Sequence, residues 1–174
     1  MSKIYVPIEY TNVREAIPPG EDIIYSTIMR AFFVGGNKKY RFKSHVLMTP
    51  NGFAWTNPIR TKKREPPKIE YYNWTKVKKV KGIGFFISPI DVFALERLDG
   101  YETKINYKKR ALEFGAFILP IMIDYAKRRR EEMANDPSIK DRKKRKMEIY
   151  KRKLELLLPK FQKKAEKAQQ KYGE

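Results

Sequence analysis

The distribution of charge and aromatic residues divides the chain into two unlike parts. Residues 127–174 contain 18 Lys/Arg against 8 Asp/Glu, in a chain whose formal net charge is +19. Tyr, Phe and Trp make up 13% of the residues and are concentrated before residue 126, so a packed core is expected there. The sequence therefore predicts a globular domain over residues 1–126 and a basic extension over residues 127–174.

The residue types present limit the chemistry open to the chain. It contains no Cys and a single His, His45, which excludes disulfides, thiolate metal sites and multi-histidine metal sites. His45 falls in an expected strand, where a structural role is favoured. We therefore expect no enzymatic activity, no metal and no cofactor. Residues 1–7 do not resemble a signal peptide, and the Lys/Glu/Arg/Ile-rich composition suits a cytoplasmic protein of a hot-living organism.

The first part is rich in strand and turn signals. Residues 23–34 are β-branched and aromatic, and residues 38–43 alternate between basic and aromatic side chains. The turn Thr49-Pro50-Asn51-Gly52 separates two further apolar runs. Additional strands are expected at residues 69–80, 84–88, 93–98 and 101–107, with a turn at Asp99-Gly100. Six or seven short strands indicate a small antiparallel barrel or sandwich.

The second part is rich in helix signals. Residues 111–126 are apolar on nearly every side, which predicts a helix buried all round, with a kink at Pro120. A long final helix is expected over residues 140–171, started by Asp136 or Ser138 and kinked or restarted at Pro159. Its apolar residues are spaced like a coiled-coil seam. The seam consists of Met147, Tyr150, Leu154, Leu157, Phe161 and Ala168. It predicts a partner helix, and we expect that partner to come from a second copy in a homodimer, with intramolecular pairing with the helix at residues 111–126 as the alternative.

Three short stretches resemble prokaryotic pleckstrin-homology-like (PH-like) domains. Residues 19–27 match a PGE-x-I opening, residues 44–54 match an SH-x-L-x-T-x-x-G hairpin, and residues 72–80 match an I-x-W-x-x-I-x-x-V strand. The resemblance covers residues 18–126. It implies an α+β fold, in which a strongly bent antiparallel sheet forms a small barrel capped by one helix, and a role in binding lipids, peptides or proteins.

The basic residues of the extension are the candidate nucleic-acid contacts. They are Lys127, Arg128, Arg129, Arg130, Lys140, Arg142, Lys143, Lys144, Arg145, Lys146, Lys151, Arg152 and Lys153. A candidate secondary anion site comprises Lys39, Arg41, Lys43, Lys62, Lys63 and Arg64. Few acids accompany the extension's cations, which favours polyanion binding over a surface laced with ion pairs.

The nature of the polyanion is open at the level of sequence. A compact head with a long basic helix loosely resembles ribosome-associated factors that silence or dimerise subunits in hibernating cells, so ribosomal RNA or a ribosomal subunit is the first expected partner. Anionic lipid bound by the PH-like head is the alternative, weakened by the absence of a broad apolar insertion face. A protein-interaction adaptor is a third interpretation, and DNA is a further candidate polyanion.

Overall fold

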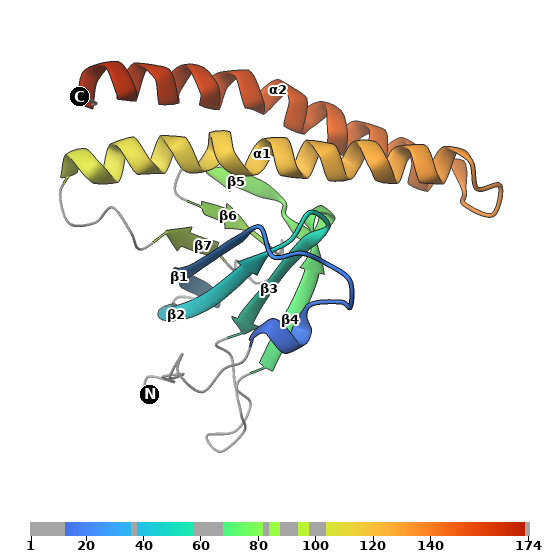
Figure 1. The fold of residues 1–174 in the computed structure, drawn as a ribbon, viewed down its shortest axis with the longest axis horizontal. Helices are drawn as coiled ribbons and strands as arrows, with labels where there is room; N and C mark the ends of the chain where they lie inside the picture. Colours follow the sequence, from blue (N-terminus) through green and yellow to red (C-terminus); the bar gives the residue numbers. More distant parts are fainter. Residues whose placement is uncertain are drawn as a thin grey trace. The chain divides into compact units, whose positions relative to one another are not determined.

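The computed structural model describes residues 13–35, 38–57, 68–81, 84–87, 94–97 and 104–172. The chain forms two compact units, Met1–Leu98 and Asp99–Glu174. In the described residues, the first unit is an antiparallel sheet with short 3-10 helices, and the second is a pair of long helices (Figure 1). The protein is therefore α+β, as the sequence predicts.

The first unit is built on one sheet in which every neighbouring pair of strands is antiparallel. Its strands are β1 (Tyr25–Gly35), β2 (Lys38–Met48), β3 (Gly52–Asn57), β4 (Lys68–Asn73), β5 (Lys79–Lys81), β6 (Gly84–Phe86) and β7 (Ala94–Arg97). Their order across the sheet is β4-β3-β2-β1-β7-β6-β5. Among the described residues no ladder joins β4 to β5, so the sheet is open and is not the closed barrel expected from the sequence.

Aromatic packing shows that this open sheet is strongly bent. Three strands separate β3 from β6 in the sheet order, so a flat sheet would place them roughly 19 Å apart. Yet the ring centroids of Phe53 in β3 and Phe85 in β6 are 5.0 Å apart. Trp74 lies 5.4 Å from Phe53 and 6.4 Å from Phe85, and all three side chains are buried. The two halves of the sheet therefore fold over a shared aromatic core.

The structure differs from the prediction for two of the expected strands, those at residues 69–80 and 101–107. The run from residue 69 to residue 80 breaks into β4, the 3-10 helix η3 (Trp74–Lys76) and β5. Asn73 causes the break, because its side-chain oxygen accepts a hydrogen bond of 3.1 Å from the backbone N–H of Thr75 and caps η3. The strand expected at residues 101–107 is also wrong, since a helix begins at Lys104. The turn expected at residues 99–100 lies outside the described residues.

A partly buried polar cluster holds the N-terminal segment against the β2–β3 hairpin. Gly20 adopts a φ of +85°, a conformation that favours glycine, and directs the chain into Glu21. Glu21 accepts hydrogen bonds from the Thr49 hydroxyl (2.5 Å), the Tyr71 hydroxyl (2.7 Å) and the Asn51 amide (2.9 Å). Both the PGE and the hairpin motifs therefore contribute residues to one structural contact.

The second unit consists of α1 (Lys104–Ala134) and α2 (Asp141–Tyr172). Pro120, where a kink is expected, lies inside α1, and Pro159, where a kink or a restart is expected, lies inside α2, which continues through it without a restart. Helix α1 is longer than the predicted helix at residues 111–126, and the predicted domain boundary at 126/127 falls inside it. It is not buried all round either, because Phe117 is 41% exposed and Pro120 is exposed.

The two helices pack antiparallel, side by side (Figure 1). The ring of Phe161 lies directly over Gly115, the half-buried Tyr150 interacts with Tyr125, and Arg130 forms an ion pair with Glu148. Along these pairs the residue number falls in α2 as it rises in α1. Burial raises the pKa of Tyr150, and the neighbouring Tyr125 raises it further. The seam of α2 therefore finds its partner helix within the chain.

The connection between the helices differs from both predicted caps. The Asp136 carboxylate accepts hydrogen bonds from the Ser138 backbone N–H (2.9 Å) and hydroxyl (2.5 Å), which closes a turn before α2 begins. These hydrogen bonds from Ser138 lower the pKa of Asp136, and the charge of Lys144 lowers it further. The helix itself starts at Asp141, where the carbonyl of Lys140 accepts the first backbone hydrogen bonds.

We expect the substitution Glu21→Gln to destabilise the first unit. The amide of Gln has one acceptor oxygen where the carboxylate has two, so part of the cluster around Thr49, Asn51 and Tyr71 loses its acceptor. Loss of a charge-assisted buried hydrogen bond costs about 1.5–3 kcal/mol. Urea unfolding measures the change, with the exposed neighbour substitution Asp22→Asn as the control. Equal unfolding midpoints for the two variants would show that the hydrogen bonds to Glu21 do not stabilise the first unit.

A second prediction concerns the approach of the helices at Gly115. A Cβ atom at this position would meet the ring of Phe161. We expect Gly115→Ala to destabilise the helix pair by about 1–3 kcal/mol, although alanine favours an isolated helix. In the Phe161→Ala background the same substitution should be neutral or stabilising, because the clash is gone. Thermal unfolding of the four proteins of this cycle measures the coupling, and additive changes would rule out the clash.

Candidate nucleic-acid interface

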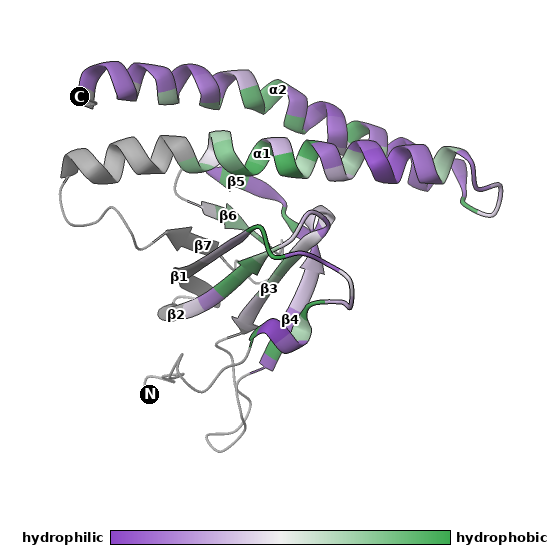
Figure 2. Cartoon of the chain, viewed as in Figure 1, coloured by the Kyte–Doolittle hydropathy of each residue, from purple (hydrophilic) through white to green (hydrophobic). Residues whose placement is uncertain are grey.

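Helix α2 has distinct sides because its residues are sorted by chemical type around the axis. The seam residues occupy the side that packs on α1, where Leu154 is buried and Met147, Tyr150, Leu157 and Phe161 are half-buried. Most of the remaining surface of α2 is hydrophilic (Figure 2). This surface carries 13 Lys/Arg and four Asp/Glu over residues 141–172. The positions of those charges decide what the helix can bind.

The four acids of α2 form a single stripe. Asp141, Glu148, Glu155 and Glu166 are spaced by 7, 7 and 11 residues, which correspond to about two, two and three turns of an α-helix. The stripe is used in ion pairs within the helix pair: Glu148 binds Arg130 of α1, and Glu155 lies 3.0 Å from Lys151. The acids are therefore confined to one edge of the helix.

The cations that face solvent gather on another side, which we call the basic arc. At roughly 100° per residue, its members fall within a sector about 120° wide. They are Arg142, Arg145, Lys146, Arg152, Lys153, Lys160, Lys163, Lys164, Lys167 and Lys171, all exposed. In the part of the chain that the structure describes, the three arginines of the arc have no ion-pair partner. From Arg142 to Lys171 the arc extends over roughly 44 Å.

The structure separates the residues that the sequence groups together as candidate contacts. Five of the candidates belong to the arc, namely Arg142, Arg145, Lys146, Arg152 and Lys153. Four others form ion pairs: Arg128 with Asp124 (3.1 Å), Arg129 with Glu132 (2.6 Å), Arg130 with Glu148, and Lys151 with Glu155 (3.0 Å). Lys144 lies near Asp136, and Lys127, Lys140 and Lys143 lie off the arc. Nearby acids therefore pair with four of the thirteen candidates, although acids are few in residues 127–174.

Half of the arc was not among the predicted contacts. Lys160, Lys163, Lys164, Lys167 and Lys171 are exposed on the same side as the predicted arginines. They are dispersed along the sequence, whereas the predicted residues occur in consecutive runs. Their spacing of three and four residues is the signal that would have identified them.

The candidates in the first unit are only partly described. Lys39, Arg41 and Lys43 alternate along β2, so they share one face of the strand, but their side chains lie outside the described residues, as do Lys62, Lys63 and Arg64 entirely. His45 in β2 is half-buried, and its Nε2 lies 3.2 Å from the Ser26 hydroxyl. Burial lowers the pKa of His45. Within the described residues no cluster of metal-ligating side chains occurs.

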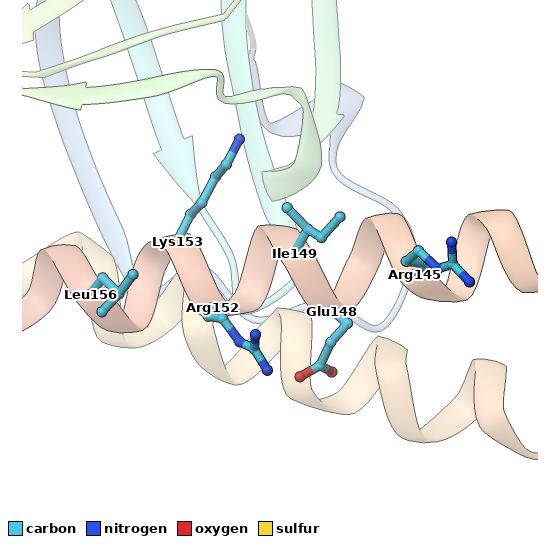
Figure 3. Close-up of a pocket in the computed structure, with 6 residues that line it drawn as sticks. All are labelled: Arg145, Glu148, Ile149, Arg152, Lys153 and Leu156. Carbon is cyan, nitrogen blue, oxygen red and sulfur yellow. The ribbon is translucent and has the colours of Figure 1, made fainter.

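A hollow lies on the surface of α2 between residues 145 and 156, with a volume of about 350 Å³. It is lined by Arg145, Glu148, Ile149, Arg152, Lys153 and Leu156. Figure 3 shows Ile149 and Lys153 on one edge, Glu148 and Arg152 on the other, and Arg145 and Leu156 at the two ends. Ile149 is 49% exposed and Leu156 is 65% exposed. Two large aliphatic side chains therefore face solvent in the middle of the basic arc.

The geometry of α2 is the basis for the functional argument that follows. Among the described residues, neither helix is apolar over a stretch long enough to cross a membrane. Comparison of the chain with protein families, with curated proteins and with solved structures found no match.

Proposed function

We propose that the protein is a non-enzymatic RNA-binding protein that holds RNA phosphates along the basic arc of α2, with ribosomal RNA or a ribosomal subunit as its first target. The observation that carries this proposal is the sorting of charge on α2. The acids lie in one stripe, where Glu148 and Glu155 form ion pairs, while the three arginines of the arc are exposed and form no ion pair with another described residue. Each cation placed on a phosphate releases condensed counterions, so a row of exposed cations of this length favours a polyanion.

The distribution of apolar residues supports RNA over a lipid surface. A helix that lies in a membrane interface needs a continuous apolar face opposite its charged face. The apolar residues of α2 are used against α1, and its large exposed hydrophobics are Ile149 and Leu156. Cations occupy most of the arc around them. Folded RNA presents dense phosphates over distances comparable to the roughly 44 Å of the arc, and helices bind it through shape and charge.

We also infer that the first unit, together with the helix that follows it as far as residue 126, is a PH-like domain. The meander of β1 to β4, the pairing of β7 with β1, and the helix that follows β7 in sequence support this inference. The bend imposed by Phe53 and Phe85 brings the sheet close to a barrel without closing its ladder. The motif residues that suggest the family have structural roles. The Thr49 hydroxyl donates a hydrogen bond to Glu21, and the Trp74 indole N–H donates one to the Thr49 carbonyl.

The test compares two variants that remove the same charge. The arc variant carries Gln at Arg142, Arg145 and Lys146, which are exposed. The control variant carries Gln at Arg128, Arg129 and Lys151, which are ion-paired. Each variant loses two arginines and one lysine. Binding to purified ribosomal RNA is measured by fluorescence anisotropy between 50 and 200 mM salt.

We expect the arc variant to lose about three phosphate contacts, so that the salt slope of log K falls by roughly 3 and affinity drops by about tenfold or more. The control variant should retain most of the parent slope. Equal losses in both variants would show that net charge, not the arc, determines binding. If the parent binds anionic vesicles and not RNA, the lipid interpretation replaces the proposal, and a duplex DNA of equal length tests whether the polyanion is RNA.

A further inference from the structure

The aliphatic side chains at the centre of the basic arc serve no purpose in a surface that binds phosphate alone. Ile149 and Leu156 are seven residues apart, about two helical turns or roughly 10.5 Å along one side of α2. Both remain largely exposed while the seam residues on the opposite side are packed. Single exposed hydrophobic residues are ordinary on a protein surface, but these two line one hollow whose other lining residues are all charged.

The rim of this hollow is cationic. Arg145, Arg152 and Lys153 surround the two aliphatic side chains, and Glu148 on the far edge is occupied by Arg130 of α1. The lining of the hollow therefore combines two aliphatic side chains with a net positive charge. Its occupant must be anionic at its edges and apolar at its centre. A second copy of this surface would place arginines against arginines, so self-association through the hollow is disfavoured.

Unpaired nucleotides have this chemistry. Their phosphates are anionic, and an unstacked base exposes an apolar face that aliphatic side chains cover and that a guanidinium stacks on. In a regular RNA duplex the bases are stacked inside, so Ile149 and Leu156 would face riboses and phosphates instead. A perfect duplex therefore offers phosphates to Arg145, Arg152 and Lys153 but no apolar surface to Ile149 and Leu156.

We propose that the hollow between Arg145 and Leu156 receives an unstacked base, so that the protein prefers RNA with bulges, internal loops or single-stranded segments over continuous duplex. This inference rests on the proposed RNA-binding function. The rest of the arc supplies affinity through phosphates, and the hollow supplies selectivity for the form of the RNA.

The test uses two RNA hairpins of equal length and phosphate count, one fully paired and one with a three-nucleotide internal loop. The full-length protein should bind the looped hairpin about tenfold more tightly at equal salt, the order of magnitude for covering apolar surface of this kind. In the double variant Ile149→Ser and Leu156→Ser, affinity for the looped hairpin should fall to that for the duplex. Affinity for the duplex and its salt slope should stay unchanged.

The control is Ile24→Ser, which removes an isoleucine of similar exposure, 42%, in the first unit and should keep the preference. Thermal unfolding verifies that both variants fold. If the parent binds both hairpins equally, or the double variant keeps the preference, the inference is wrong while the RNA-binding function stands, and a protein partner becomes the alternative occupant. If the parent binds neither hairpin at low salt, both the inference and the proposed function fail.

Discussion

Packing between α1 and α2 determines what the rest of the second unit presents to solvent. The close approach of Phe161 to Gly115 and the contact of Tyr150 with the buried Tyr125 fix which side of α2 is covered. With that side fixed, the acid stripe falls beside α1, where Glu148 neutralises Arg130. The cations of the arc lie on the remaining side, where they are exposed. One apolar seam therefore positions both the neutralised charges and the exposed ones.

The sequence predicts elements well where local chemistry decides them. The β2–β3 hairpin follows from Asn51-Gly52, and the long final helix follows from its seam spacing. Prediction fails where two local signals compete. Asn73 caps a 3-10 turn inside an apparently continuous strand, and the helix signal of α1 extends back over residues assigned to a strand. The bend of the sheet depends on contact between Phe53 and Phe85, which no local pattern encodes.

The sequence correctly predicts that α2 is a helix rich in cations, but it does not predict which side of that helix carries the exposed cations. Runs of consecutive cations identify α2, yet a run of five residues surrounds a helix and cannot face one partner. Angular position separates Arg145, which belongs to the arc, from Lys143, which does not. A run also hides local pairing, because Lys151 is adjacent to Arg152 in sequence but bound to Glu155 in space. The arc therefore includes fewer residues of the run 142–146 than the sequence indicates, and it extends beyond Lys153 to Lys171.

The pairing of β1 with β7 has a consequence for the order in which the chain acquires structure. Met29 pairs with Arg97, so β1 must wait for a strand nearly seventy residues downstream before its second edge is filled. Contacts this distant in sequence form slowly, whereas two helices joined by a short turn pair through nearby residues. During synthesis on the ribosome, the sheet remains incomplete until β7 has left the exit tunnel. The helical hairpin emerges last and has the shorter search, so the two units differ in folding time as well as in architecture.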